Sequence, residues 1–369
     1  MFHAPVARRR RSHHPRRPGR GGARGRPGPP GLLRPRLRPA RRAERAGSDG
    51  RGPVTSRPQS WTSLPRTRVA VLGTAHVHLP DHLAAVAADD DAEPVAVLEH
   101  ADAVIICSTT AGHRDLLRRA VAAGLPALVE KPLAAGAAET AALAALACRA
   151  RAPVTTAMFL RCAPSLRRAA RLLADGDLGE PVAADLSFSH AGLLDGTLTA
   201  DSAAWMLDPR RAGPGGAFAD LGVHLVDLLR WLRPGAEIAV RGAVLRHRPE
   251  YAVNIGGTAL LDWDGVPVTV HADWTTRPGG LLVRLHGTRG TVIVRDGEVA
   301  AHVGGTRRVE RLPPPSAGHA TTAFLAALRG RESWRAPDPA DMVACAVTLE
   351  EALELGGGIS ADTPRRPGR

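Results

Sequence analysis

Lysine is almost absent from this chain. Of its 49 Lys and Arg residues, only Lys131 is a lysine, and it lies in the run Ala127-Leu-Val-Glu-Lys-Pro-Leu133. A Lys ammonium is compact and its pKa can be shifted by its surroundings, whereas an Arg guanidinium stays charged. The single lysine is therefore a candidate catalytic residue. The alternative is that Lys131 has no special role and remains by chance in a composition that strongly favours Arg.

Cysteine and long apolar runs are also scarce. No apolar run approaches the roughly 18 residues that cross a bilayer. The chain has four cysteines without Cys-x-x-Cys spacing, which argues against structural zinc and favours reduced thiols: Cys107, Cys148, Cys162 and Cys345. We therefore expect a soluble, cytoplasmic protein.

The formal net charge of +13 comes from one end of the chain. Residues 1–66 hold 18 Arg against Glu44 and Asp49. Their Arg, Pro and Gly content cannot bury enough apolar surface to form a core. We predict a disordered extension over 1–66 and a disordered tail over 357–369. Because the remainder is slightly acidic, no specific nucleic-acid surface is expected. Non-specific phosphate contacts by the extension, or a start site placed too far upstream, are the open alternatives.

The segment after residue 66 begins like a βαβ unit. A buried strand at 68–73 is followed by a helix at 80–88. The turn between them keeps only the first glycine of the G-x-G-x-x-G pattern, so the signal is weak by itself. Such a turn presents backbone N–H groups to a pyrophosphate. The candidate cofactor contacts are therefore Gly73, Thr74, Ala75 and His76.

Three histidines in the same region, His76, His78 and His82, raise the possibility of a metal site. Two of them are one helical turn apart. No cysteine lies nearby and a phosphate-binding turn occupies the same place. The sequence therefore favours no metal.

Two further strands end in polar residues. Strand 103–107 runs into Ser108 and Thr109, with His113 at the start of the next helix. Strand 127–130 delivers Glu130 and Lys131 at its carboxyl end. Ligands of open α/β sheets bind at that edge.

A second motif is Gly213-Pro-Gly-Gly-Ala-Phe-Ala-Asp220-Leu-Gly-Val-His224-Leu-Val-Asp227. Asp220 and His224 are four residues apart and project from one face of a helix. A carboxylate in this position can orient an imidazole. An ordinary ion pair on a helix surface would have the same spacing.

Together, Val129-Glu-Lys-Pro-Leu133 and this second motif resemble the glucose-fructose oxidoreductase and inositol dehydrogenase family of nicotinamide-dependent sugar oxidoreductases. The resemblance covers residues 67 to 356. It implies an α/β fold, with a Rossmann-type parallel sheet over 67–156 and an α+β substrate domain with a large open, mostly antiparallel sheet over 157–356. It also implies a homodimer or homotetramer.

The resemblance implies hydride transfer between NAD or NADP, with NAD weakly preferred, and a sugar or polyol. The implied role of His224 is that of a general base. Lys131 would stabilise the alkoxide or share the proton, and Asp220 would orient His224 or hold a neighbouring hydroxyl. Ser108, Thr109, His113 and Glu130 are implied cofactor contacts. Arg161 and Trp205 are implied substrate contacts, with ordinary packing as the alternative.

One departure from the family concerns the second strand. That strand, at 93–97, is followed after five residues by the next strand at 103. A parallel crossover needs about a dozen residues, which puts the adenosine half of the cofactor site in question. Three interpretations stay open: a shortened but active domain, a damaged sequence of an ordinary enzyme, and a degenerate domain that binds a sugar or nucleotide without turnover.

The second domain is predicted to be mostly strands. Expected strands cover 181–188, 237–246, 254–263, 266–275, 281–287 and 290–295, followed by helices at 317–329 and 338–355. Asp264-Gly265 and Asp296-Gly297 predict tight hairpin turns.

Overall fold

The computed structural model describes residues 66–331 and 335–357. The predictions for residues 1–65 and 358–369 lie outside this described part. Within it, no helix combines the length and the apolar character that crossing a bilayer requires.

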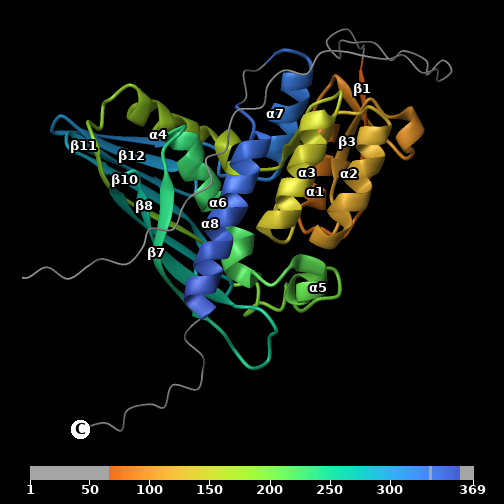
Figure 1. Ribbon diagram of the computed structural model, residues 1–369. Helices are drawn as coiled ribbons and strands as arrows, with labels where there is room; N and C mark the ends of the chain where they lie inside the picture. Colours follow the sequence, from red (N-terminus) through yellow and green to blue (C-terminus); the bar gives the residue numbers. More distant parts are fainter. Residues whose placement is uncertain (1–65, 332–334, 358–369) are drawn as a thin grey trace, which may run out of the picture. The chain divides into compact units, whose positions relative to one another are not determined.

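The first sheet is parallel and has helices on both faces (Figure 1). Its strand order is β2-β1-β3-β4-β5. The elements in chain order are β1 (Thr67–Leu72), α1 (Leu79–Ala87), β2 (Ala92–Val95), β3 (Ala103–Ile106), α2 (His113–Ala122), β4 (Ala127–Val129), α3 (Ala137–Arg149) and β5 (Val154–Thr156), with short 3₁₀ turns at Leu98–His100 and Thr110–Gly112.

Alternate residues of these strands face opposite sides of the sheet. Val69 and Ile105 pack in one core with Val86 of α1. Val104 packs in a second core with Leu117 of α2, as does Leu143 of α3. The near-continuous apolar runs in these strands reflect burial on both faces.

The prediction that a short β2–β3 connection cannot form a parallel crossover is wrong. β2 pairs with residues 67–70 of β1, whereas β3 pairs with residues 69–72 on its other side. β3 is thus shifted along β1 relative to β2, and it begins at nearly the same level at which β2 ends. The connection therefore has to cross β1 sideways, over two strand spacings or about 10 Å, and does not have to run back along the length of a strand. The 3₁₀ turn Leu98–His100 makes this crossing without a helix.

The second sheet has eight strands in the order β13-β12-β11-β10-β6-β9-β8-β7. β6 and β9 are parallel, and all other neighbours are antiparallel. The strands are β6 (Pro181–Ser189), β7 (Ile238–Arg246), β8 (Gly256–Trp263), β9 (Val266–Asp273), β10 (Gly280–Gly287), β11 (Gly290–Arg295), β12 (Glu298–Val303) and β13 (Thr306–Arg311).

Six of these strands lie within two residues of their predicted bounds, whereas β12 and β13 were not predicted. Asp264 and Gly265 both have positive φ, as do Asp296 and Gly297. This is the backbone geometry of the predicted two-residue hairpin turns.

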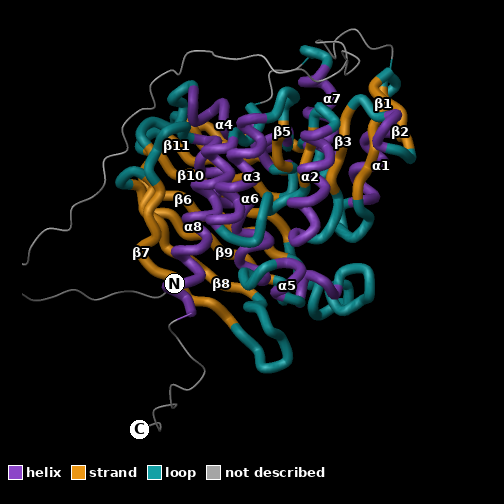
Figure 2. Tube along the Cα trace, turned by 45° about the vertical axis from the view of Figure 1, so that its right-hand side comes forward, coloured by secondary structure: helices purple, strands orange, loops and turns teal. Residues whose placement is uncertain are grey.

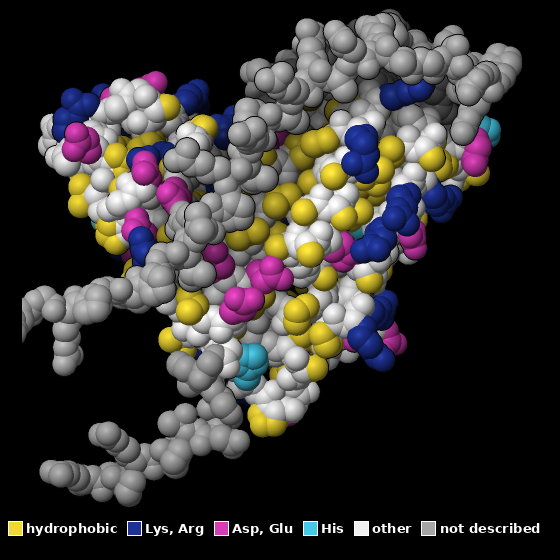
Figure 3. Space-filling model, in the orientation of Figure 1, with side chains coloured by type: hydrophobic (Ala, Val, Ile, Leu, Met, Phe, Trp, Pro, Cys, Tyr) yellow, Lys and Arg dark blue, Asp and Glu magenta, His cyan; other side chains and the backbone are white. Residues whose placement is uncertain are grey.

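Helices cover one face of the second sheet, as Figures 1 and 2 show. The covering helices are α4 (Pro164–Ala174), α6 (Gly216–Leu232) and α8 (Pro339–Gly357). This part of the chain also contains helices α5 (Pro209–Ala212) and α7 (Gly318–Leu328), and 3₁₀ turns at Phe159–Cys162 and Ala204–Leu207. α7 follows the second sheet in sequence but packs against α1 of the first sheet. On the surface seen in Figure 3, basic side chains stand beside acidic ones.

A buried ion cluster ties three elements together. Arg161 is fully buried in the 3₁₀ turn after β5. It donates to both carboxylate oxygens of Asp227 on α6, at 2.8 and 2.6 Å, and to Asp341 on α8 at 2.9 Å. Because two carboxylates meet one guanidinium out of water, the cluster depends on its single cation.

Replacing Arg161 with Met is expected to lower the free energy of unfolding by about 3–5 kcal/mol, because buried carboxylates lose their cation. The matched control is Arg168→Met. Arg168 pairs with Glu310 at a partly exposed site, where the loss should be about 0–1 kcal/mol. Urea denaturation of both variants measures the difference. Equal losses would show that the Arg161 cluster contributes no special stability.

Candidate active site

A cavity of about 320 Å³ lies between the carboxyl edge of the first sheet and the helix-covered side of the second sheet. Its polar lining includes His78, Lys131, His190, Asp220 and His224. Phe159, Phe188, Leu198 and Met206 form much of its apolar wall. Lys131, Asp220 and His224, predicted from separate motifs, are thus brought to one place.

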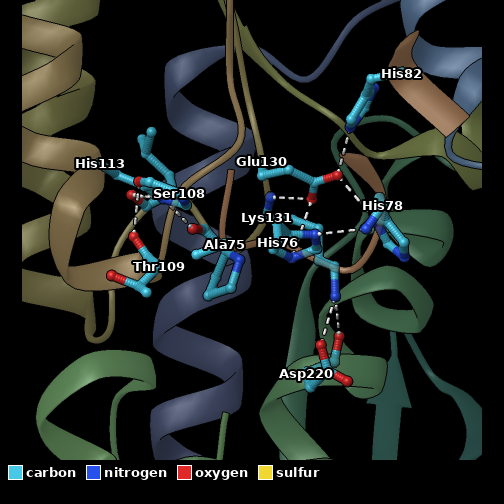
Figure 4. Close-up of polar contacts among 12 residues, drawn as sticks. Ala75, His76, His78, His82, Ser108, Thr109, His113, Glu130, Lys131 and Asp220 are labelled. Atoms are coloured by element: carbon cyan, nitrogen blue, oxygen red, sulfur yellow. Dashed lines mark hydrogen bonds and ion pairs between the residues drawn. The ribbon is translucent and has the colours of Figure 1, made fainter. Parts of the chain in front are cut away.

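Lys131 and Asp220 form an ion pair across the two halves of the protein (Figure 4). The Lys131 Nζ lies 2.5 Å from Asp220 Oδ1 and 3.2 Å from the Asp220 carbonyl oxygen. Trp274 Nε1 donates to Asp220 Oδ2 at 3.0 Å. Burial opposes ionisation of Asp220, but the charge and hydrogen bond of Lys131 outweigh it and lower the pKa of this carboxyl.

The implied orientation of His224 by Asp220 is not what the structure shows. The Asp220 oxygens contact Lys131 and Trp274, whereas neither ring nitrogen of His224 has a hydrogen-bond partner. The helix places the two side chains on one face, but the lysine lies closer to the carboxylate.

His224 is positioned by packing instead. Its ring makes edge contacts with Phe159 and Phe188, at centroid distances of 4.6 and 5.9 Å. Burial lowers the pKa of His224 well below its ordinary value, and the nearby Lys131 ammonium acts in the same direction. The imidazole is therefore neutral at pH 7, and one of its two nitrogens carries a lone pair that can accept a proton.

Glu130 does not face the cavity as a cofactor contact. Its carboxylate is fully buried and is surrounded by three imidazoles, as Figure 4 shows. The closest are His82 Nε2 at 2.7 Å and His78 Nδ1 at 2.9 Å, with His76 Nε2 at 3.6 Å. A carboxylate held in this way links strand β4 to the β1–α1 turn.

The predicted contacts at the ends of β1 and β3 lie together. Gly73 has φ +83°, and a Cβ there would come within 2.6 Å of Ser108 Cβ, so only glycine fits. Thr74 is exposed, and Ala75 and Thr109 are partly exposed. These residues lie together at the carboxyl edge of the sheet, where Gly73 packs directly against Ser108.

His113 is fully buried, and its Nδ1 lies 3.0 Å from the Pro132 carbonyl oxygen. It therefore supports the loop after Lys131 and offers no surface to a cofactor. The position after strand β3 correctly predicted that His113 lies near this edge, but not that it points inward.

Arg161 and Trp205 do not line the cavity, contrary to the implied substrate role. Arg161 belongs to the buried ion cluster with Asp227 and Asp341. Trp205 donates from Nε1 to the Ala75 carbonyl oxygen at 2.8 Å, and its ring lies 5.8 Å from that of His76. Trp205 thus holds the β1–α1 turn from the side of the second sheet.

Several cavity residues were not predicted from the sequence. His190 follows strand β6, and burial lowers its pKa. Phe159 and Phe188 enclose His224, and Trp274 holds Asp220. These residues belong to no motif, although the scarcity of aromatic residues, at 3% of the chain, could have marked them as candidates.

The topology of the first sheet suits a dinucleotide. β1 is flanked by β2 on one side and β3 on the other, which makes the Gly73 turn a topological switch point. Helix α1 starts after this turn, but its first turn offers few free N–H groups, because Leu79 N–H donates to the His76 carbonyl oxygen and Pro80 has no N–H. Gly73, Ser108 and Thr109 would hold the cofactor there.

Family profiles match both halves of the chain. Residues 78–158 match an oxidoreductase family with an NAD-binding Rossmann fold, and residues 166–293 match a GFO/IDH/MocA C-terminal domain. The fold and the cavity thus define a nicotinamide-type oxidoreductase. The chain belongs to the Gfo/Idh/MocA family, as its two motifs indicated.

Relatives and solved structures agree with this assignment. A dTDP-3,4-didehydro-2,6-dideoxy-α-D-glucose 3-reductase of Streptomyces violaceoruber is 30% identical over 82% of this chain and 90% of the relative. A D-apiose dehydrogenase of Paraburkholderia graminis is 29% identical over 62% of this chain and 60% of the relative. An inositol dehydrogenase homologue from Azotobacter vinelandii, solved with NAD⁺, has a TM-score of 0.70 at 18% identity and covers 83% of this chain and 99% of that structure. Its likeness confirms the fold.

Buried neutral His224 predicts how stability depends on pH. Its pKa in the folded protein is lowered, so below about pH 6.5 the unfolded chain binds a proton that the folded chain does not. Stability must therefore fall as the pH is lowered from 7 to 5. We expect His224→Phe, which keeps an aromatic ring between Phe159 and Phe188, to lose less stability over this range. Parallel urea denaturation curves at both pH values test the difference, and an equal loss in both proteins would contradict it.

Proposed function

We propose that this oxidoreductase transfers a hydride between NAD(H) and a hydroxyl-bearing carbon of a sugar or polyol. The observation that carries the proposal is the convergence of Lys131, Asp220 and His224 on one cavity at the edge of the first sheet. The names of the two relatives support a sugar substrate. The cavity volume of about 320 Å³ suits a small molecule.

The nicotinamide, when bound, supplies the hydride chemistry. The residues of this chain supply position, charge and proton transfer. His224 is the general base in the direction of alcohol oxidation, because its ring is neutral and has no competing partner. In the direction of carbonyl reduction the same nitrogen returns the proton.

Lys131 stabilises the oxygen on which negative charge develops. Its ammonium is 3% exposed and is held by Asp220 at the cavity wall. A preorganised cation in a site with little water stabilises an alkoxide strongly. Asp220 fixes the ammonium and prevents it from leaving the cavity for solvent.

NAD is the expected cofactor rather than NADP. The segment after β2, residues 96–102, is where the adenosine ribose is read in Rossmann folds. It contains Glu99 and no arginine that would pair with a 2′-phosphate.

Binding and turnover test this function in the full chain. Calorimetric titration with NADH and NADPH should give tighter binding of NADH. A screen of sugars and polyols with NAD⁺ should then give NADH formation. Absence of binding by either dinucleotide would reject the dehydrogenase function and favour a non-catalytic sugar-binding protein.

Replacing Lys131 with Met should lower kcat by about 100- to 10,000-fold, because the alkoxide loses its cation. The same range is expected for His224→Gln, which removes the base but keeps a polar side chain. Exposed Arg307 on β13 supplies the control, Arg307→Met, which should leave kcat unchanged. Steady-state kinetics separate kcat from KM. Unchanged kcat in Lys131→Met would remove the lysine from the mechanism.

We also propose self-association through the second sheet. On its face opposite the helices, Val244 and Leu260 are 56% and 47% exposed. Polar neighbours on this face bond to one another, as Thr269 does to Asp185 at 2.7 Å. A face that exposes apolar side chains between polar groups bonded to one another can pack against a second copy of itself.

Analytical ultracentrifugation is expected to show a dimer or tetramer. Leu260→Glu should raise its dissociation constant by at least about tenfold, because a carboxylate would lose its hydrating water at the interface. Leu83→Glu is the control, since Leu83 is 42% exposed on α1 and lies away from the sheet. A monomeric full-length chain, or equal effects of both substitutions, would reject this interface.

A further inference from the structure

The buried carboxylate of Glu130 has an unusual set of neighbours. Three imidazoles surround it, from His76 and His78 in the β1–α1 turn and from His82 on α1. Figure 4 shows these side chains directed toward the Glu130 carboxylate from one side of the strand end. We call these four residues the Glu130 cluster.

The donor atoms are close enough to share one ion. The ligating atoms of His76, His78 and Glu130 all lie within 4.8 Å of one another. His78 Nδ1 is 2.9 Å from Glu130 Oε1, and His76 Nε2 is 3.6 Å from Oε2. Ligands around a Zn²⁺-sized ion, each about 2.1 Å from the metal, are separated by comparable distances.

The charge of Glu130 also needs a cation. A carboxylate removed from water is stable only when it is paired or binds a metal. The nearest ammonium, Lys131, points to Asp220. The compensating charge therefore has to come from a proton on one of the imidazoles or from a bound cation.

We propose that His76, His78 and Glu130 form a binding site for a divalent transition metal. Two imidazoles and one carboxylate are ligands that Zn²⁺, Co²⁺ and Fe²⁺ accept, and a set of three leaves open positions for water or another ligand. The site is distinct from the Lys131–Asp220 pair and does not depend on the proposed oxidoreductase chemistry.

Neighbouring groups orient the carboxylate ligand. The Lys131 backbone N–H donates to Glu130 Oε2 at 2.9 Å. His82 lies 2.7 Å from Oε1 through Nε2 and 2.7 Å from Thr321 Oγ1 through Nδ1. His82 is thus a positioning residue for the metal site. Metal binding would cost one hydrogen bond. Without a metal, the His78 backbone N–H donates to His76 Nδ1 at 3.3 Å. When Nε2 of His76 binds a metal, Nδ1 must carry the ring proton, so it can no longer accept this hydrogen bond.

His78 supplies a route for the ion. Its side chain is 22% exposed and lines the catalytic cavity, whereas Glu130 and His82 are fully buried. A metal entering from the cavity would meet His78 first. Its open coordination positions would then face the cavity and the water in it.

Titration of the EDTA-treated full chain with Co²⁺ and Zn²⁺ tests the proposal. Calorimetry should show one strong site per chain, with release of a proton where the ion replaces the proton of a charged imidazole beside the carboxylate. Co²⁺ should also acquire a visible spectrum typical of low coordination number. Glu130→Gln and His78→Gln should each weaken binding by at least about 100-fold, and His82→Asn by about 10- to 100-fold.

Exposed histidines provide the control. His302→Asn, on β12, should leave the affinity unchanged. If wild-type binding is no tighter than that of Glu130→Gln, or if His302→Asn weakens it equally, the ion is bound elsewhere and the proposal is overturned. Should Glu130→Gln fail to fold, His78→Gln decides, because partly exposed His78 contributes less to the core. These readouts are independent of dinucleotide binding and turnover.

Discussion

The end of strand β4 is the point on which the rest of the site depends. Two adjacent residues there carry opposite charges and point in different directions. Glu130 binds the β1–α1 turn and helix α1 through its imidazole neighbours, and Lys131 binds Asp220 on α6. The β1–α1 turn of the first sheet and helix α6 beside the second sheet are thus fixed to the same two residues.

This arrangement explains why the cavity can be both polar and well ordered. Buried charges are tolerated only when each has a partner. Asp220 neutralises Lys131, and Asp227 and Asp341 neutralise Arg161. Against these paired groups, His224 stands out because both of its nitrogens lack a partner. Its position among aromatic rings keeps it neutral and available for proton transfer.

The shortened first domain shows how strand register can replace a helix. The stagger of β2 and β3 along β1 reduces the crossover to a lateral step. The Gly73 turn, helix α1 and the carboxyl edge of β1, β3 and β4 are retained in full. Loss of the crossover helix is therefore compatible with an intact edge at which a dinucleotide can bind.

The sequence by itself determined the elements and the motifs. Apolar runs defined the buried strands, Asp-Gly pairs defined two hairpin turns, and the Glu-Lys-Pro and Asp-x-x-x-His motifs marked the family. These are local signals, carried by neighbours along the chain. The motifs also pointed to Lys131, Asp220 and His224, which line one cavity, but not to the partners of these residues.

Tertiary structure alone decided which groups meet. Asp220 is four residues from His224 but pairs with Lys131, 89 residues away. Arg161 and Trp205 point away from the cavity, and Glu130 turns inward to histidines that precede it by about fifty residues. Ion pairs and buried hydrogen bonds depend on distances of a few ångströms between distant segments, and spacing along the sequence carries no information on such distances.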